Sequence, residues 1–304
     1  MRRRGRTIIL LYHRVTSVAS DPFGLCVRPD RFAEQLRHLR RMAAVVPLRR
    51  CLEPSSGCRV ALTFDDGYHD NATEAAPMLQ SGGLPATFFV TAGMLDRAEE
   101  YWWDRLEGLL SSEGRGGGHL DLMTHEGRLW VDVRSPGGRR RALWALHRRL
   151  RFWGRAEIRA VLDQVARQLG ADEVPRETHR AMTTEELLRL AAGEGCDIGA
   201  HTVSHPSLLQ LPDDQQFQEV AESRQRLEAL LGRPVEAFSY PFGGSDAWDT
   251  VTVGCVRRAG FRLACTALAG AVPRRPHPLT LPRHYVRDWS GLELAERLRR
   301  WFAE

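Results

Sequence analysis

Two histidines and two aspartates of the sequence have the types and spacing of a metal site. His201 and His205 are four residues apart, which places both imidazoles on one side of a single turn. Asp65 and Asp66 are adjacent, and two ionised carboxylates repel each other unless a cation relieves the repulsion. One carboxylate with two imidazoles is a ligand set that suits Zn²⁺ or another divalent first-row ion.

Such a site would support metal-assisted hydrolysis. Three protein ligands leave a coordination position for water, and the ion lowers the pKa of that water towards about 7. The second carboxylate could then accept the proton as a general base. A plainer interpretation also fits these residues alone. In it, the histidines lie on the surface, and Asp65 and Asp66 cap the following helix.

Short β-branched or aromatic runs alternate with segments of helical period, and these elements must position the site. We expect strands at residues 7–15, 59–64, 86–91, 196–200, 236–240, 261–266 and 281–286. We expect helices at residues 30–42, 71–80, 184–192, 213–231, 248–259 and 291–302. Thr183 and Glu186 form a capping box at the start of one of them. This alternation predicts parallel strands with right-handed crossovers, and therefore an α/β barrel or a doubly wound sheet.

Candidate polar residues fall at the carboxyl ends of the expected strands. In parallel α/β folds, sites are built at that edge of the sheet. We therefore expect one site to gather these residues, which are His13, Asp65, Asp66, His201, Tyr240 and Arg283.

Residues 94–182 interrupt the alternation. They contain a Gly-rich stretch at 114–118, followed by Arg139–Ala156, which has seven arginines and no acidic residue. We expect a helical insertion packed on the barrel with its arginines outward. The alternative is attachment to an anionic membrane surface, or a lid that meets a charged substrate. Trp102 and Trp103 could stack on a sugar ring or pack the insertion.

Composition limits the class of protein. The chain has 304 residues, of which 43% are hydrophobic and 27% charged, which excludes a wholly disordered chain. All 43 basic residues are arginine, but the net charge of +5 is too mild to predict a nucleic-acid partner. No apolar run approaches the roughly 18–20 residues that cross a bilayer.

Cysteine spacing and the first residues bear on the compartment. The six cysteines include no C-x-x-C pair, so we expect reduced and mostly buried thiols. A basic start is followed by the apolar run Ile8–Leu11, which is shorter than the roughly 7–15 residues of a signal-peptide core. We therefore expect a first strand behind a basic tail, in a cytoplasmic protein. Peripheral contact with the inner membrane face or a lipid-linked sugar is a further expectation.

Three motifs carry a resemblance to a known family. TFDDG at 63–67, HTVSHP at 201–206 and SYPFG at 239–243 occur in the order seen in polysaccharide deacetylases, the NodB-homology proteins of carbohydrate esterase family 4. The chain resembles this family over roughly residues 7–302, apart from the insertion. The resemblance implies a distorted (β/α)₇ barrel, with one NodB-homology domain over residues 1–304 interrupted by residues 94–182. It also implies hydrolysis of an acetamido group on a sugar, giving an amine and acetate.

The resemblance also implies roles for individual residues. Asp66, His201 and His205 are similar to the family's metal ligands, and Asp65 is similar to its catalytic base. The implied cofactor is a divalent metal with Zn²⁺ as the default, and such a site also accepts Co²⁺ or Ni²⁺. The backbone N–H of Phe242 would join the metal in stabilising the oxyanion.

Two departures from the family pattern affect the expected site. The family has an arginine two residues before the proline of its third motif, and here that position is Ser239. We expect Arg283 to replace it as the partner of Asp65, since a guanidinium fork can pair with a carboxylate. A purely structural role on the last strand is the alternative for Arg283. We also expect Tyr240, which precedes this motif's proline, to face the substrate together with Phe242.

The second departure concerns the general acid. The family's late Leu-x-His motif is not evident, so His13 and His284 are the two candidates. His13 lies in a segment that resembles the first strand of deacetylases acting on poly-N-acetylglucosamine, where a histidine is proposed as the acid. An imidazole has a pKa suited to protonating a departing amine. The alternative for His13 is a core histidine bonded to the backbone.

The function expected from all these features is metal-dependent removal of an N-acetyl group from a sugar of a glycan, glycolipid or glycan precursor. The same site could instead act as a sugar O-acetyl esterase or an N-deformylase. A non-enzymatic carbohydrate-binding module is the rival from another class. The paired base and metal ligands argue against it, because binding alone needs no base.

Overall fold

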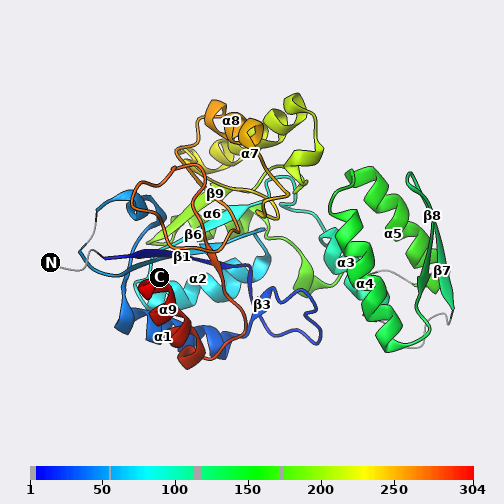
Figure 1. Ribbon diagram of the computed structural model, residues 1–304, viewed down its shortest axis with the longest axis horizontal. Helices are drawn as coiled ribbons and strands as arrows, with labels where there is room; N and C mark the ends of the chain where they lie inside the picture. The colour runs from blue at the N-terminus through cyan, green and yellow to red at the C-terminus, as the bar shows by residue number, and fades with distance from the viewer. Residues whose placement is uncertain (1–4, 55, 112–117, 172–173) are drawn as a thin grey trace. The chain divides into compact units, whose positions relative to one another are not determined.

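The structure is a computed structural model that describes residues 5–54, 56–111, 118–171 and 174–304 (Figure 1). The basic tail at 1–4 and most of the Gly-rich stretch, residues 112–117, lie outside the described residues. The chain divides into two compact units. One consists of the residues up to Asp96 together with Met182–Glu304, and the other is Arg97–Ala181.

The first unit is built on a parallel sheet. Its strands are β1 (Thr7–Tyr12), β4 (Ala44–Val45), β5 (Arg59–Phe64), β6 (Ala86–Val90), β9 (Cys196–Ala200), β10 (Ala237–Ser239), β11 (Leu263–Cys265) and β12 (His284–Tyr285). The main order is β11-β10-β9-β6-β5-β1-β12, and β4 pairs with the start of β5. A separate parallel pair joins β2 (Arg14–Val15) to β3 (Cys26–Val27).

The last segment of the sheet forms hydrogen bonds with strands near both ends of the strand order. Leu281 N donates to Ala264 O of β11 at 2.9 Å. A few residues later, Val286 N donates to Leu11 O of β1, also at 2.9 Å. The seven strands of the main path therefore curl into the distorted (β/α)₇ barrel, which confirms the expected fold class.

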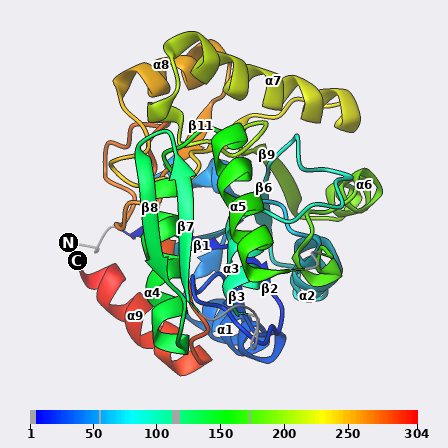
Figure 2. The same cartoon turned by 90° about the vertical axis from the view of Figure 1, so that its right-hand side faces the viewer.

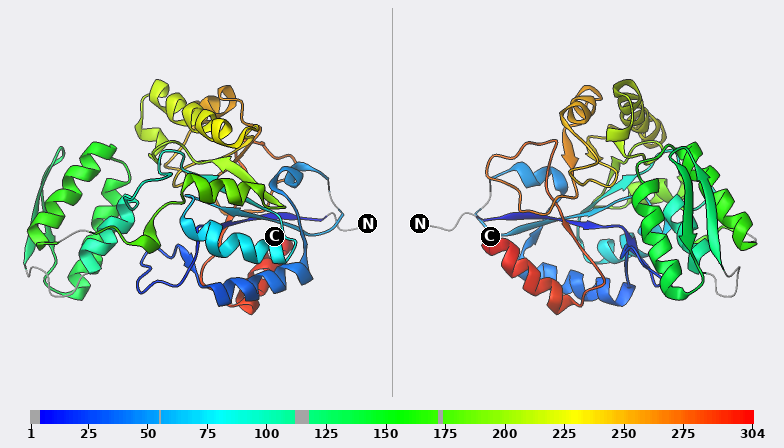
Figure 3. Two further views of the ribbon diagram at one scale, coloured as in Figure 1. Left: turned by 180° about the vertical axis from the view of Figure 1, so that it is seen from behind. Right: turned by 45° about the vertical axis from the view of Figure 1, so that its right-hand side comes forward.

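Helices cover the outer side of this sheet. They are α1 (Pro29–Met42), α2 (Ala76–Ser81), α6 (Thr184–Ala192), α7 (Asp213–Leu231), α8 (Thr250–Arg258) and α9 (Gly291–Ala303). Helices α1 and α9 lie side by side, as do α7 and α8 (Figure 2). Figure 3 shows both pairs from two further directions. The capping box of Thr183 and Glu186 begins α6 as expected, and Gly232 ends α7 in the left-handed conformation.

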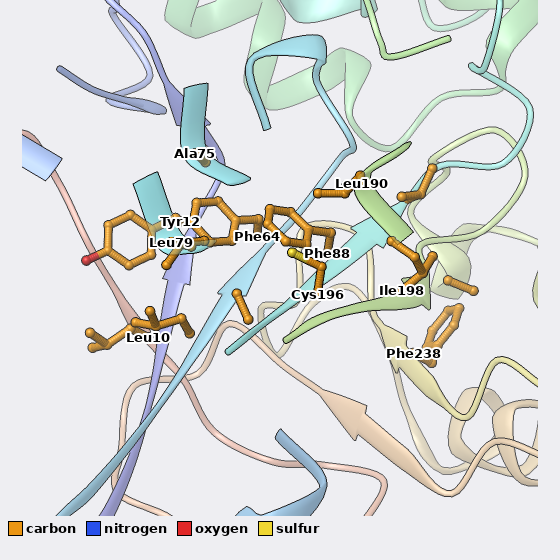
Figure 4. Packing of buried hydrophobic residues seen from close by; sticks show 14 of the residues in the cluster. Leu10, Tyr12, Phe64, Ala75, Leu79, Phe88, Leu190, Cys196, Ile198 and Phe238 are labelled. Carbon is orange, nitrogen blue, oxygen red and sulfur yellow. The ribbon is translucent and has the colours of Figure 1, made fainter. Parts of the chain in front are cut away.

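Alternate strand residues form two separate cores. The outer core packs the sheet against the helices and includes Leu10, Phe64, Phe88, Ile198 and Phe238 (Figure 4). The inner core includes Ile9, Ala61, Phe89, Ala237 and Leu281. Because strand side chains alternate with period two, the parity of a residue decides which core it faces. His13, Asp65, His201, Ser239 and Arg283 share the parity of the inner core.

The second unit contains a β-hairpin as well as helices, so the expectation of a helical insertion was incomplete. Its helices are α3 (Trp102–Ser111), α4 (Pro136–Leu150) and α5 (Arg155–Leu169), and its antiparallel strands are β7 (His119–Thr124) and β8 (Gly127–Asp132). Leu120, Leu122 and Val131 are buried while their neighbours are more exposed. This period of two is the strand signal that a search for helical period overlooks.

Two glutamines of α5 cover the free edge of the hairpin. The side-chain amide of Gln164 accepts from Met123 N at 2.9 Å and donates to Met123 O at 2.9 Å. Gln168 does the same for Asp121, at 2.8 and 2.7 Å. These side chains satisfy backbone groups that a bare strand edge would leave to water or to another chain.

The Arg-rich helix α4 has the two faces that its pattern predicts. Leu143, Leu146 and Leu150 are buried, and the exposed positions include arginines at 140, 141, 148 and 149. The two tryptophans pack within this unit. The ring of Trp103 is stacked on Tyr101 with centroids 4.6 Å apart, and that of Trp102 on His147 with centroids 5.2 Å apart. Packing, the plainer of the two expectations, therefore accounts for both.

The thiols and the helices bear on two further expectations. All six cysteines are free, and five of them are buried, as their spacing predicts. Across the part of the chain that the structure describes, no helix has both the length and the apolar character to cross a membrane.

Candidate active site

Three side chains that are far apart in the sequence meet at one end of the barrel. The Nε2 atoms of His201 and His205 lie 3.4 and 3.2 Å from the same carboxylate oxygen of Asp66. One ligand atom from each of the three residues lies within 4.8 Å of the others, and all three residues are buried. Nitrogen and oxygen donors in this arrangement fit Zn²⁺ or a related divalent ion.

A hydrogen bond sets the tautomer of His201. Its Nδ1 lies 2.7 Å from the carbonyl oxygen of Ser239. A carbonyl only accepts, so Nδ1 carries the proton and Nε2 presents its lone pair to the cluster. Bonds of this kind orient the histidine ligands of metal sites, so this arrangement also fits a metal.

The backbone of the site is strained. Five residues other than glycine have positive φ among those that the structure describes, and four of them belong here: Asp66 (74°), Thr202 (64°), His205 (59°) and Phe242 (60°). Such conformations are costly for L-residues and persist only where the surroundings fix them. The strain therefore follows the three motifs, each of which leaves its strand and turns sharply to present a side chain.

Asp65 is held by the arginine that we expected to replace the family's own. Arg283 Nη1 and Nη2 donate to the two carboxylate oxygens of Asp65 at 2.7 and 2.6 Å, and both residues are buried. Ser239, at the family's arginine position, donates its hydroxyl to Asp65 at 3.0 Å and accepts from Arg283 at 2.8 Å. The serine leaves room for the guanidinium that arrives from the last strand.

The neighbouring charges control the ionisation of the two aspartates. Burial raises the pKa of Asp65, but Arg283 and His201 outweigh it, and the pKa stays below its usual value. Burial also raises the pKa of Asp66, but the contacts with His201 and His205 outweigh it and hold that pKa below its usual range. Both carboxylates are therefore ionised at neutral pH. A base of such low pKa cannot deprotonate ordinary water, so it needs a cation that acidifies the water first.

His13 lies in the break between β1 and β2. Its ring is stacked on Tyr285 with centroids 4.9 Å apart, and its carbonyl accepts from Asn71 Nδ2 at 2.7 Å. The Nδ1 atom is buried, with no hydrogen-bond partner among the described residues. Burial lowers the pKa of His13 below its usual value, although the charges of Asp66 and Asp65 act to raise it. These charges act on His13 because it belongs to the same end of the barrel.

Two expected site residues point away from the site. The hydroxyl of Tyr240 donates to Leu279 O at 2.9 Å, and its backbone N–H donates to Cys265 O at 3.2 Å, so both donors are used elsewhere. His284 is stacked on Trp301 of α9, with centroids 4.0 Å apart. Assigning Tyr240 to the substrate and naming His284 as a candidate acid were therefore wrong. Tyr240 directly follows Ser239, and His284 directly follows Arg283. Because Ser239 and Arg283 have inner parity, the side chains of Tyr240 and His284 have outer parity.

Phe242 lies beside the metal-ligand cluster. Its ring meets that of His205 edge-on, with centroids 4.9 Å apart. Gly243 follows it with φ of 57°, and a Cβ there would lie 2.5 Å from Ala267 N. The turn is thus fixed by a close backbone contact that only glycine permits. The expected role of the Phe242 N–H towards an oxyanion stays a prediction.

Tyr285 is a further residue of this site, and we did not predict it. It is half-buried, its ring is stacked on His13, and the Arg287 guanidinium carbon lies 4.0 Å from the centre of its ring. Parity could have found it, because it is two residues after Arg283 and so faces the same side. The expected strand ran through both residues.

Comparisons with known proteins show what this chain is similar to. The profile of the family described as polysaccharide deacetylase matches residues 53–264. YxkH of Bacillus subtilis (strain 168), named for the same family, is 22% identical over 292 residues, which cover 93% of this chain and 72% of YxkH.

Solved structures share the fold. The Streptococcus pyogenes deacetylase PplD, in complex with acetate, has a TM-score of 0.62 and 18% identity, covering 98% of this chain and 99% of PplD. IcaB from Ammonifex degensii has a TM-score of 0.62 and 20% identity, covering 97% of each chain. At these identities the likeness shows a common fold.

Proposed function

The chain belongs to the polysaccharide deacetylase family of hydrolases that act on acetamido bonds, and from this premise we propose that it is a metal-dependent N-deacetylase. Its substrate would be an N-acetylated sugar of a glycan, a glycolipid or a glycan precursor. The products would be acetate and the free amine.

One observation carries this proposal. The adjacent residues Asp65 and Asp66 are held by different partners, Arg283 for the first and two histidines for the second. One carboxylate can thus remain outside the coordination of an ion that the other holds. A base beside a separate ligand set is the arrangement that hydrolysis of an amide needs.

Asp66, His201 and His205 would hold the metal. When bound, a divalent ion acidifies water and polarises the acetyl carbonyl. Asp65 accepts the proton of the attacking water while Arg283 keeps both carboxylate oxygens in place. These separate roles of metal and base are consistent with the low pKa of Asp65, because only an acidified water can lose its proton to this carboxylate.

The remaining residues act after the attack. The backbone N–H of Phe242 donates to the oxyanion that forms as the water oxygen bonds to the acetyl carbon. The carbon–nitrogen bond then breaks, and His13 gives a proton to the departing amine. His13 is suited to this because a stacked Tyr285 holds its ring and the Asn71 amide holds its backbone.

Acetate release tests the proposal. N-acetylated oligosaccharides and lipid-linked sugars are each incubated with the protein, with and without a chelator. We expect acetate from at least one N-acetyl substrate, loss of activity with the chelator, and recovery on adding Zn²⁺, Co²⁺ or Ni²⁺. Release that continues unchanged after the metal is removed would contradict the proposal.

Matched substrates separate the rival functions. N-acetyl, N-formyl and O-acetyl forms of one sugar distinguish an N-deacetylase from an N-deformylase and an O-acetyl esterase. A carbohydrate-binding module would instead bind the sugar in the presence of chelator and release no acetate. A cytoplasmic location, with contact of the Arg-rich helix α4 at the inner membrane face, stays a prediction that cell fractionation measures.

A further inference from the structure

We propose that Glu219 of α7 is a positioning residue that fixes the loop between the two histidines of the metal-ligand cluster. The proposal rests on the function proposed above only in that the cluster binds a divalent metal. Glu219 touches neither the cluster nor the reacting atoms, and it would act through residues 202–205.

The carboxylate of Glu219 accepts three hydrogen bonds from this loop. Its Oε2 accepts from Val203 N and Ser204 N, both at 2.9 Å, and its Oε1 accepts from Ser204 Oγ at 2.7 Å. Both carboxylate oxygens are thus directed at two consecutive residues of the loop. Successive backbone N–H groups form a concentration of positive partial charge, and an ionised acceptor bonds to it most strongly.

The loop needs such support because of its conformation. Thr202 and His205 have φ of 64° and 59°, in the region that residues other than glycine avoid. The strain occurs at both ends of the segment that Glu219 holds. Loss of the three bonds would let the backbone relax towards an ordinary conformation and would turn the His205 ring away from the cluster.

The carbonyl groups of the loop are bonded by the chain that follows β6. Ala92 N donates to Thr202 O at 3.0 Å, and Gly93 N donates to Val203 O at 2.8 Å. A Cβ at Gly93 would lie 2.5 Å from that oxygen. The chain after β6 thus bonds carbonyl groups of the loop, and Glu219 bonds its amide groups.

The two histidines differ in their dependence on this loop. His201 directly follows β9, where its N donates to Val90 O at 2.9 Å and its Nδ1 bonds Ser239 O. His205 lies at the far end of the loop, where its N donates to Thr202 Oγ1 at 3.0 Å. Removing the Glu219 carboxylate would therefore displace His205 and leave His201, Asp66 and the Asp65–Arg283 pair in place.

Zn²⁺ affinity of the full-length chain tests this proposal. The variants are Glu219→Ala, which removes all three bonds, and Glu219→Gln, which removes the negative charge but keeps one oxygen that can accept from the two N–H groups. Glu222→Gln is the matched control, because Glu222 lies one turn further along α7 and bonds Arg226 instead. Competition with a chromophoric chelator gives each dissociation constant. We expect affinity about 10–100-fold weaker for Glu219→Ala, a smaller loss for Glu219→Gln, and an affinity equal to the wild type for Glu222→Gln.

Further measurements keep the test decisive. At saturating Zn²⁺, Glu219→Gln should recover most of the wild-type kcat, whereas a residue that touches substrate would not recover. If Glu219→Ala fails to fold, Ser204→Ala removes one of the three bonds and should weaken Zn²⁺ binding by a smaller factor. Wild-type affinity in Glu219→Ala, or in both Glu219→Gln and Ser204→Ala if Glu219→Ala does not fold, would overturn the inference. A wild-type chain that binds no divalent metal would instead refute the proposed function itself.

Discussion

Arg283 and Asp65, which are 218 residues apart in the sequence, form a buried bidentate ion pair with hydrogen bonds of 2.7 and 2.6 Å. A buried pair is tolerated only when its remaining polar groups are also bonded. Here Arg283 Nε donates to Thr266 O at 2.8 Å, and its Nη1 donates to Thr63 Oγ1 at 3.1 Å. The pair thus fixes the position and the charge of the proposed base together.

Substitution of Asp65 should remove catalysis and spare metal binding. In Asp65→Asn the amide cannot accept the proton, so we expect kcat to fall by about 10²–10⁴-fold. Zn²⁺ affinity should stay within a few-fold of the wild type, because Asp66 and the histidines are unchanged. Acetate release and chelator competition measure the two effects. Asp197→Asn is the control, since Asp197 pairs with Arg233 at the surface. Turnover at the wild-type rate in Asp65→Asn would exclude it as the base.

The bidentate geometry of the Arg283 guanidinium should contribute to catalysis and stability in addition to its charge. Arg283→Lys keeps a cation but cannot bond both oxygens of Asp65. We expect kcat to fall at least about tenfold and the free energy of unfolding to fall by about 1–3 kcal/mol, because buried partners lose bonds. Zn²⁺ affinity should change little. Arg233→Lys, at the exposed pair with Asp197, is the control. An unchanged kcat would support the purely structural role for Arg283.

The general-acid role of His13 predicts a dependence on the leaving group. His13→Gln should lower kcat on N-acetyl sugars by about 10²–10⁴-fold, because the departing amine needs a proton. The aryloxide of an activated aryl acetate departs without a proton, so the hydrolysis of this ester should be affected far less. The measurement is the ratio of the two rates in variant and wild type. Equal losses on both substrates would contradict the acid role, and His277→Gln, at an exposed histidine, is the control.

Stability should depend on pH through His147 of the second unit. Its ring lies against Trp102, and burial together with Arg151 lowers its pKa to about 4. The unfolded chain titrates this group near 6.5. Between these values the unfolded state binds more protons, so the free energy of unfolding decreases as the pH falls from about 6.5 to about 4.

Urea unfolding at about pH 7.5 and about pH 5 measures this effect. The contribution of His147 to the difference is at most about 2 kcal/mol at pH 5, since each pKa unit is worth about 1.4 kcal/mol. His147→Gln should reduce the difference by up to that amount, whereas His125→Gln, at an exposed histidine, should not. A difference that is the same in His147→Gln and the wild type would disprove the assignment.

Local pattern was sufficient for many elements. The ranges expected from pattern, 59–64, 184–192, 196–200 and 213–231, are the bounds of β5, α6, β9 and α7 in the structure. Apolar period, capping residues and a terminal glycine act within a few residues of one another, so sequence alone reveals them. The hairpin of β7 and β8 was missed because its period of two lay inside a segment interpreted as helical.

Sequence pattern and tertiary structure therefore contributed different parts of the site. Residue types and spacing were enough to identify the three motifs, the strand ends that carry them and, through parity, the inward direction of Asp65 and Arg283. The stacking of Tyr285 on His13 and the bonds from the loop before His205 to Glu219 became visible only in the folded chain. Those contacts depend on how a curled sheet and its covering helices bring distant segments together, and no short-range pattern encodes that closure.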